Sequence, residues 1–193
     1  MSHELVQAFL TLRDDCIWLQ TTFNYMNVLF ESENSERDSL MRRTAPIFFE
    51  DLNRVLIEYF VVNVYRLTDR PQGMGRQNLT ISGLNEKLKS DGLMNTVIER
   101  SAAGMLEFGQ KLKDARHRIV AHSDWDTALN KLVLGVHSDE ERKEFFFHMY
   151  TYVDAVGEAL GVGPLDFRST GGVGDALDLL RCLKAGQHRS RLG

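Results

Sequence analysis

The sequence contains little cysteine, which excludes several common kinds of small domain. Only Cys16 and Cys182 occur in 193 residues, far apart and each within an apolar helical pattern. This spacing predicts neither a disulfide nor a metal-binding cluster of thiols. We therefore expect both cysteines to be small, buried side chains.

The chain also lacks an excess of positive charge and any long apolar run. Its formal net charge of -4 at pH 7 excludes a protein that coats nucleic acid over its whole surface, and limits any RNA contact to a local basic cleft. The N-terminus has no basic region ahead of an apolar stretch, and later apolar runs are too short or too charged to cross a bilayer. These features predict a cytoplasmic protein that makes no membrane contact.

Internal repeats and a phosphate-binding loop are absent as well. Residues 171–175, GGVGD, lack the lysine and the following Ser or Thr of a P-loop. Residues 131–136, KLVLGV, are the one short strand candidate, and nothing obvious is available to pair with it. Helical spacing dominates the rest, beginning with residues 5–30, where apolar side chains recur at alternating steps of four and three.

Three further stretches show the same helical periodicity. Their apolar stripes are Phe48, Leu52, Val55, Tyr59 and Val62, widened by Phe49, Leu56, Phe60 and Leu67; then Ile98, Ala102, Met105, Gly109, Leu112 and Ile119; then Phe146, Met149, Val153, Val156 and Leu160.

Residues that commonly begin a helix precede several of these stretches. The expected start signals are Ser35 with Asp38, or Thr44 ahead of Pro46; Ser82; Ser138 with Glu141 as a capping box; and Asp175 for a last helix to about Lys184. Residues 68–78 are predicted to form a loop, and Asp91 with Gly92 a turn.

Together these elements predict an all-α protein, an antiparallel helical bundle of about four to six helices. Residues 1–160 are expected to form the bundle domain. Residues 161–193 are expected to form a glycine-rich linker and a short C-terminal helix.

The basic segment of residues 114–125, DARHRIVAHSDW, is the most unusual feature of the sequence. Continuing the stripe from Ile98 by helical steps puts Arg116 on the apolar face, where a guanidinium needs a partner, a ligand or a water-filled cleft. On an ideal helix, Arg116 and His122 lie about 60° to either side of Ile119 and border one wide face.

Two other interpretations of this segment remain open. Arg118 and His122 are four residues apart and would be direct neighbours on a helix. Alternatively, Arg116, His117 and Arg118 occupy the last turn of a helix and favour the negative end of its dipole. Asp124 either fixes the tautomer of His122 or belongs to a local turn.

The residues Arg116, His117 and His122 resemble the motif of the HEPN superfamily, an Arg followed by a polar residue and, after four to six intervening residues, a His. A second stretch, YRLTDRPQGMGRQNLTISGL at residues 65–84, is similar to the R-L-x-D, loop and N-L-T/S-L pattern of the AbiU-like abortive-infection branch. Ile81 replaces the more usual leucine. The resemblance extends over about residues 40–160 and implies a HEPN-type bundle.

This resemblance implies a metal-independent endoribonuclease that works as a homodimer, with the Arg and His of both protomers lining one cleft. Arg116 and His122 are then the catalytic candidates and His117 a supporting one, with no metal ion and no cofactor. Imidazole supplies general acid and base near neutral pH, and arginine binds phosphate through two parallel hydrogen bonds. The expected products end in a 2′,3′-cyclic phosphate.

The same resemblance suggests RNA-binding roles for Arg118 and Arg66, and a prokaryotic defence or toxin setting with a separate antitoxin or regulator. For Arg66 and Asp69 the residues themselves allow either a cleft or a buried ion pair, and we favour the ion pair. The alternative function is a non-catalytic HEPN module that binds RNA, a nucleotide or a protein partner. In a third interpretation the basic segment is an internal structural network of a dimeric protein.

Overall fold

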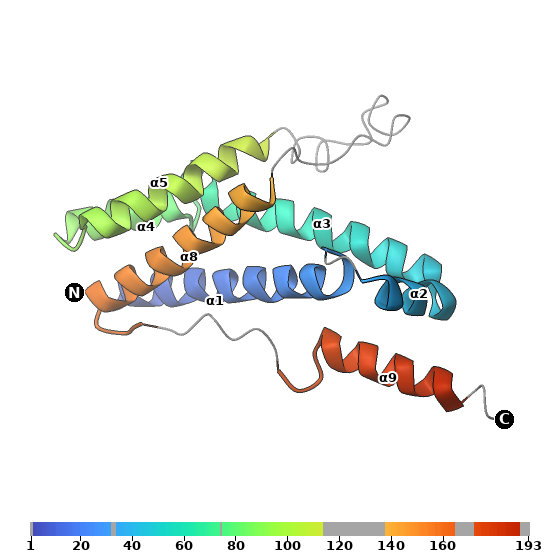
Figure 1. The fold of residues 1–193 in the computed structure, drawn as a ribbon. Helices are drawn as coiled ribbons and strands as arrows, with labels where there is room; N and C mark the ends of the chain where they lie inside the picture. The colour runs from blue at the N-terminus through green and yellow to red at the C-terminus, as the bar shows by residue number, and fades with distance from the viewer. Residues whose placement is uncertain (1, 32–33, 74, 114–137, 165–171, 190–193) are drawn as a thin grey trace. The chain divides into compact units, whose positions relative to one another are not determined.

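The computed structural model describes residues 2–31, 34–73, 75–113, 138–164 and 172–189. These residues form seven α-helices, one π-helical turn and a two-stranded hairpin (Figure 1). The elements in chain order are α1 (His3–Met26), η1 (Asn27–Glu31), α2 (Ser35–Thr44), α3 (Pro46–Thr68), β1 (Gln72–Gly73), β2 (Arg76–Gln77), α4 (Ile81–Ser90), α5 (Thr96–Lys111), α8 (Asp139–Ala159) and α9 (Ala176–Arg189). The all-α prediction is confirmed, and the number of helices reaches seven because Pro46 starts a helix separate from α2.

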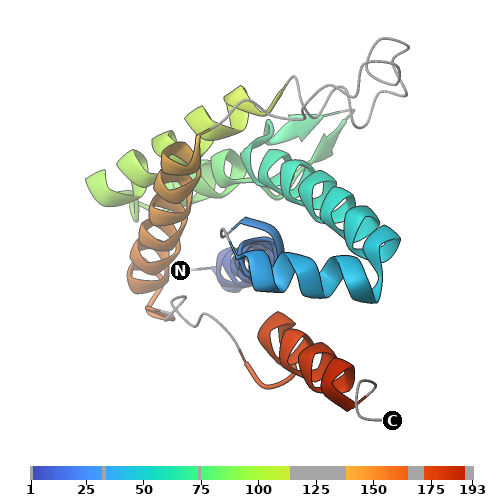
Figure 2. The same ribbon diagram turned by 45° about the vertical axis from the view of Figure 1, so that its right-hand side comes forward.

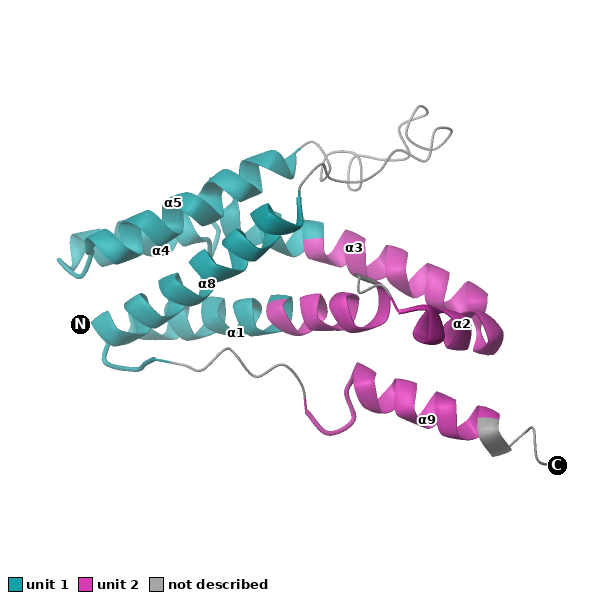
Figure 3. Cartoon of the chain, viewed as in Figure 1, with its two compact units in different colours: residues 1–19, 61–167 teal, residues 20–60, 168–193 magenta. Residues whose placement is uncertain are grey.

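The chain divides into two compact units (Figure 3). Unit 1 comprises residues 1–19 and 61–167, and unit 2 comprises residues 20–60 and 168–193. The predicted boundary at residue 160 separates a bundle domain from a linker and C-terminal helix. The division into compact units does not test it, so it stays a prediction.

The core of unit 1 is built from the apolar stripes of five helices. Its fully buried side chains include Leu5, Phe9, Leu12 and Leu19 from α1, Val64 and Leu67 from α3, Ile81, Leu84 and Leu88 from α4, Ile98, Met105 and Leu112 around α5, and Phe145, Met149, Tyr152 and Val156 from α8. The Tyr152 hydroxyl donates a hydrogen bond of 2.8 Å to Asn85 Oδ1 and so links α8 to α4. Burial raises the pKa of the Tyr152 hydroxyl, which therefore stays a donor.

Unit 2 has a smaller core of its own. Leu29, Met41, Phe49 and Ala176 are buried together, and the half-buried Leu180 and Leu183 of α9 pack against them. Lys184 of α9 pairs with Glu36 of α2 at 2.7 Å, so the C-terminal helix is joined to α2 by apolar and ionic contacts.

Several local signals in the sequence are confirmed. Ser138 and Glu141 form both hydrogen bonds of the capping box. The Asp175 carboxylate accepts hydrogen bonds from the backbone N–H groups of Leu177 and Asp178, and α9 begins there but extends to Arg189. Gly92 follows Asp91 with a φ of 70°, as a tight turn requires.

Other local predictions are wrong. Thr80, not Ser82, caps α4, because its hydroxyl accepts a hydrogen bond from Gly83 N at 3.1 Å. Within the predicted loop, Gln72 pairs with Gln77 in a short antiparallel hairpin, and Gly75 turns with a φ of 75° (Figure 2). Cys182 is exposed on α9, whereas Cys16 is buried as expected, and burial raises the pKa of the Cys16 thiol.

The predicted stripe of α3 is confirmed only in part. Phe48, Val55 and Tyr59 are exposed by 57%, 57% and 42%, whereas Phe49, Phe60 and Leu67, which widen the predicted stripe, are buried. Both adjacent faces of this helix are apolar, so one of them remains exposed after the other has been buried in the core.

Candidate functional site

The candidate site is the basic motif segment, which follows α5 and precedes α8 in the sequence. Arg116, His117, Arg118, His122 and Asp124 all fall outside the described residues, as do residues 131–136. The geometry on either side of the segment, at Lys111 and Ser138, is described.

Helix α5 carries the first part of the predicted apolar stripe. Helix α5 begins at Thr96, where the Asn95 side chain caps it, and ends at Lys111 with Leu112 as its C-cap. The predicted continuation of the stripe through Arg116 to Ile119 falls outside the described residues and stays a prediction.

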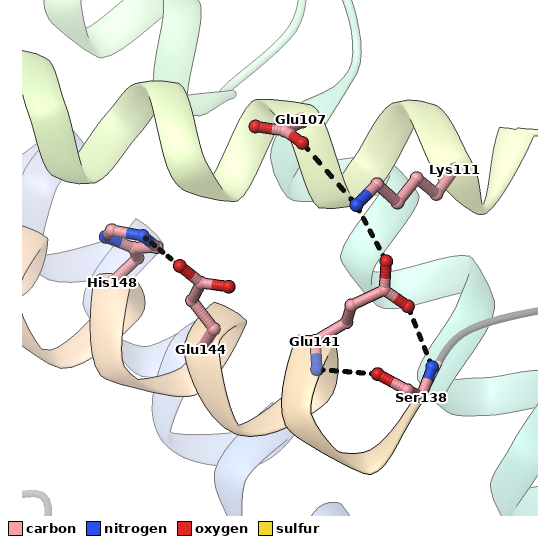
Figure 4. Close-up of polar contacts among 6 residues, drawn as sticks. All are labelled: Glu107, Lys111, Ser138, Glu141, Glu144 and His148. Atoms are coloured by element: carbon pink, nitrogen blue, oxygen red, sulfur yellow. Dashed lines mark hydrogen bonds and ion pairs between the residues drawn. The ribbon is translucent and has the colours of Figure 1, made fainter.

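Helices α5 and α8 form the most extensive helix pair among the described elements and run antiparallel (Figure 4). The aromatic rings of Phe108 and Phe145 pack with their centroids 4.8 Å apart. A Cβ on Gly104 would collide with the imidazole ring of His148, so this glycine allows the two helices to approach closely.

An ion-pair cluster, which we call the clamp, joins the end of α5 to the start of α8, the two helices that flank the motif segment in the sequence (Figure 4). Its members are Glu107, Lys111, Ser138 and Glu141. Lys111 Nζ lies 2.8 Å from Glu141 Oε1 and 3.4 Å from Glu107 Oε1. Glu141 Oε2 accepts a 2.8 Å hydrogen bond from the Ser138 backbone N–H. The clamp therefore connects the last turn of α5 to the first turn of α8.

The charges of the clamp stabilise one another. Two hydrogen bonds hold the pKa of Glu141 below its usual value. The bond from Lys111 has the larger effect, and the bond from the Ser138 N–H has the next largest. The hydrogen bond to Glu141 raises the pKa of Lys111. Both side chains are charged and paired over the physiological range, so the clamp has a structural role at the adjoining ends of α5 and α8.

His148 is a second titratable group on the same helix pair. Its side chain is 17% exposed, and Nε2 lies 3.9 Å from Glu144 Oε1. With Gly104, Glu107 and Lys111 it lines a small cavity of about 120 Å³. This distance is too long for a hydrogen bond, and the cavity is too small for a nucleotide.

Sequence reasoning missed the clamp and His148. Lys111 and Glu141 are 30 residues apart, and only the antiparallel pairing of α5 with α8 brings them together. Glu141 was recognisable as part of a capping box but not as a partner of Lys111. His148 had a local signal, a glutamate four residues earlier in the sequence.

The buried pair expected for Arg66 and Asp69 is wrong. The Arg66 side chain is 62% exposed, with Nη2 3.7 Å from Asp15 Oδ2 and a hydrogen bond of 3.1 Å from Nη1 to Asn63 Oδ1. Asp69 instead accepts hydrogen bonds from the Tyr65 hydroxyl and the Arg70 N–H. Arg66 is thus an accessible cation at the end of α3.

In the described ranges, no group of three or more His, Cys, Asp or Glu side chains is arranged to hold a metal ion. Likewise, none of the described helices combines the length and the apolar character needed to cross a bilayer.

Comparison with known proteins places these features in a family. The family model of AbiU2, a HEPN family linked to abortive infection, matches residues 2–179, a range that includes the motif segment and the clamp. Neither a curated protein nor a solved structure matches the chain significantly. The chain therefore belongs to the AbiU2 family of HEPN proteins.

Proposed function

We propose that this protein is a metal-independent endoribonuclease of a prokaryotic defence system, in which Arg116 and His122 are catalytic and His117 assists. The observation that carries the proposal is the Arg-x5-His spacing of residues 116–122 within the region matched by a HEPN family.

The clamp supports this proposal. Lys111 and Glu141 join the two helices that precede and follow the motif segment, and the Phe108–Phe145 ring contact lies one turn further in. A catalytic segment gains accuracy when rigid elements hold both of its ends. The clamp provides such an anchor without using the motif residues.

The proposed chemistry needs only the residue types of the motif. A histidine removes the proton of the 2′-hydroxyl, and the 2′-oxygen forms a bond to phosphorus while the bond from phosphorus to the 5′-oxygen breaks. A second histidine returns a proton to the departing 5′-oxygen, and arginine stabilises the charge that develops on the phosphoryl oxygens. A two-fold homodimer supplies two copies of each group to one cleft.

Two accessory features belong to the same proposal. Arg118 and Arg66 bind RNA phosphates, and the Arg66 side chain is sufficiently exposed for this role. We infer that the protein acts in the cytoplasm, where its RNA substrates are, and that a separate antitoxin or regulator controls it. The exposed apolar residues of α3 support a homodimer, because large exposed apolar surfaces commonly mark interfaces.

The test is cleavage of end-labelled RNA in excess EDTA by the native protein and by the variants Arg116→Ala and His122→Ala. Arg100→Ala on α5 and His3→Ala on α1 are matched controls, because both residues are exposed and neither belongs to the motif. We expect cyclic-phosphate products from the native protein and both controls, and a loss of at least about a hundredfold in each motif variant.

Two results would contradict the nuclease. RNA that stays intact with folded, dimeric native protein would favour the non-catalytic binding module, above all if the protein retains the RNA. Cleavage that survives both motif substitutions would show that another site, or a contaminating nuclease, is responsible.

A further inference from the structure

Unit 2 contains a cavity that the proposed nuclease does not use. It has a volume of about 320 Å³ and lies between α2 and α9, two helices of the same compact unit. This volume falls at the lower end of the range typical of small-molecule sites. We call this cavity the α2–α9 pocket.

The lining of the pocket combines apolar and cationic side chains. Leu40 of α2 and Leu177 and Leu180 of α9 provide the apolar part. Four cations, Arg37, Arg43, Arg181 and Lys184, accompany a single acidic lining residue, Glu36. An apolar surface with a cationic border suits a ligand that has both an apolar body and a negative charge.

Three of the four cations are engaged with carboxylates. The buried guanidinium of Arg37 donates hydrogen bonds to Asp38 Oδ1 at 2.8 and 3.0 Å and to the Val28 carbonyl oxygen at 3.2 Å. Arg181 pairs with Asp178 at 2.7 Å, and Lys184 pairs with Glu36 at 2.7 Å. These pairs fix the walls of the pocket and leave little net charge there.

Arg43 differs from the other three cations. Its Nε donates a hydrogen bond of 3.2 Å to the Ser39 carbonyl oxygen, and its side chain is exposed. Within the described residues, no carboxylate lies at ion-pair distance from its guanidinium. The uncompensated positive charge of the pocket is therefore concentrated at Arg43, where the two terminal NH₂ groups can bind an anion.

We propose that the α2–α9 pocket binds a small amphiphilic organic anion, whose acidic head pairs with Arg43 and whose apolar body covers Leu40, Leu177 and Leu180. Because the pocket wall includes residues of both helices, the ligand also fastens α9 to α2. It adds to the Lys184–Glu36 pair and to the 3.0 Å hydrogen bond from Gln187 Nε2 to Thr44 Oγ1.

The experiment is a fluorescence titration of the full chain with anilinonaphthalene sulfonate, an aromatic anion, followed by competition. Decanoate, decyltrimethylammonium and inorganic phosphate serve as competitors, because they separate the contribution of the charge from that of the apolar body. The test variants are Arg43→Ala and Leu177→Ser. Their matched controls are Arg42→Ala on α2 and Leu179→Ser on α9, where Leu177 and Leu179 are 43% and 41% exposed and only Leu177 lines the pocket.

We expect saturable binding that decanoate displaces and that the cation and phosphate leave in place. Arg43→Ala should weaken the affinity about tenfold, as the loss of a charge-assisted hydrogen bond does, and Leu177→Ser should weaken it severalfold. Both controls should bind like the native protein. An unchanged near-ultraviolet circular dichroism spectrum verifies that each variant is folded.

Several results would overturn the proposal: no saturable binding to the native protein, equal losses in the test and control variants, or displacement by the cation or by phosphate as effective as that by decanoate. The outcome is independent of the nuclease, because the pocket residues lie in unit 2 and outside residues 114–125. Cleavage of RNA by Arg43→Ala is a separate readout.

Discussion

Arg66 shows what individual residues of this protein reveal from the sequence alone. Its place in the R-L-x-D stretch marked it as important, but the same stretch suggested an ion pair with Asp69 that does not form. The actual contact with Asp15 on α1 depends on how α1 and α3 pack, which no local pattern encodes. The sequence therefore singled out Arg66 but did not identify the residue that it contacts.

Replacing Arg66 with alanine should weaken RNA binding through charge alone. An exposed cation that contacts one phosphate contributes about one unit to the slope of log affinity against log salt concentration. We expect Arg66→Ala to lower that slope by about one unit in a fluorescence-anisotropy titration with catalytically inactive protein. Breaking the exposed 3.7 Å contact with Asp15 costs little folding stability.

Arg100→Ala is the control for this measurement, since it removes an equal charge from the exposed side of α5. If both variants change this salt-dependence slope equally, Arg66 contributes only to the overall charge of the molecule and does not contact a phosphate.

At the scale of helices, capping residues in the sequence indicated where a helix starts, whereas the apolar pattern indicated less well which face of a helix is buried. The Ser138–Glu141 capping box is confirmed in both of its hydrogen bonds. Thr80 was missed as a cap because Ser82, two residues later, has the same chemistry. The predicted stripe of α3 included both the exposed Phe48 and the buried Phe49, because these residues begin two adjacent apolar stripes and only the packing partner selects Phe49.

The clamp gives the α5–α8 pair a pH-dependent stability. The pKa of Glu141 is lowered in the folded state, so the contribution of its charge is present above about pH 4.5 and is lost as the pH falls through the lowered value. The pKa of Lys111 is raised, so its contribution is present below about pH 10.5 and is lost as the pH rises through the raised value. Between these limits both contributions are present.

Lys111→Met should therefore lower the melting temperature near neutral pH by a few degrees at most, as expected for an exposed pair. The difference from the native protein should disappear as the pH approaches 3. Thermal denaturation between pH 3 and 7 measures both effects, with the exposed Lys143→Met as the control. A difference that persists unchanged at pH 3 would mean that Lys111 acts by packing instead of charge.

At the scale of the whole molecule, composition and periodicity were sufficient for the fold class. The helical stripes predicted an all-α bundle, and the family match over residues 2–179 agrees with the resemblance seen in two short motifs. The division into two compact units had no counterpart in the sequence, because α1 and α3 pass through both units without a break in composition. The motif residues themselves remain a prediction.

The exposed apolar residues of α3 lead to a prediction about assembly. If the proposed homodimer buries this face, Val55→Glu should raise the dissociation constant of the dimer at least about tenfold, because the new carboxylate would be desolvated at the interface. Sedimentation velocity at micromolar concentration measures the shift. Val97→Glu on α5 is the control, since Val97 is 48% exposed and Val55 is 57% exposed.

A monomeric native protein would contradict the dimer itself. A dimer that tolerates Val55→Glu as well as Val97→Glu would place the interface on another surface.

The contacts between α5 and α8 also limit which insertions the family can tolerate. Gly104 meets His148 and Lys111 meets Glu141, so both contacts are separated by seven residues on each helix. One added residue between the contacts turns the remainder of a helix by about 100°, and the two contacts can no longer form together. Relatives of this protein should therefore differ in length outside residues 104–111 and 141–148. A relative that has gained a residue within one of these ranges should have lost either the small residue at position 104 or the Lys111–Glu141 charge pair.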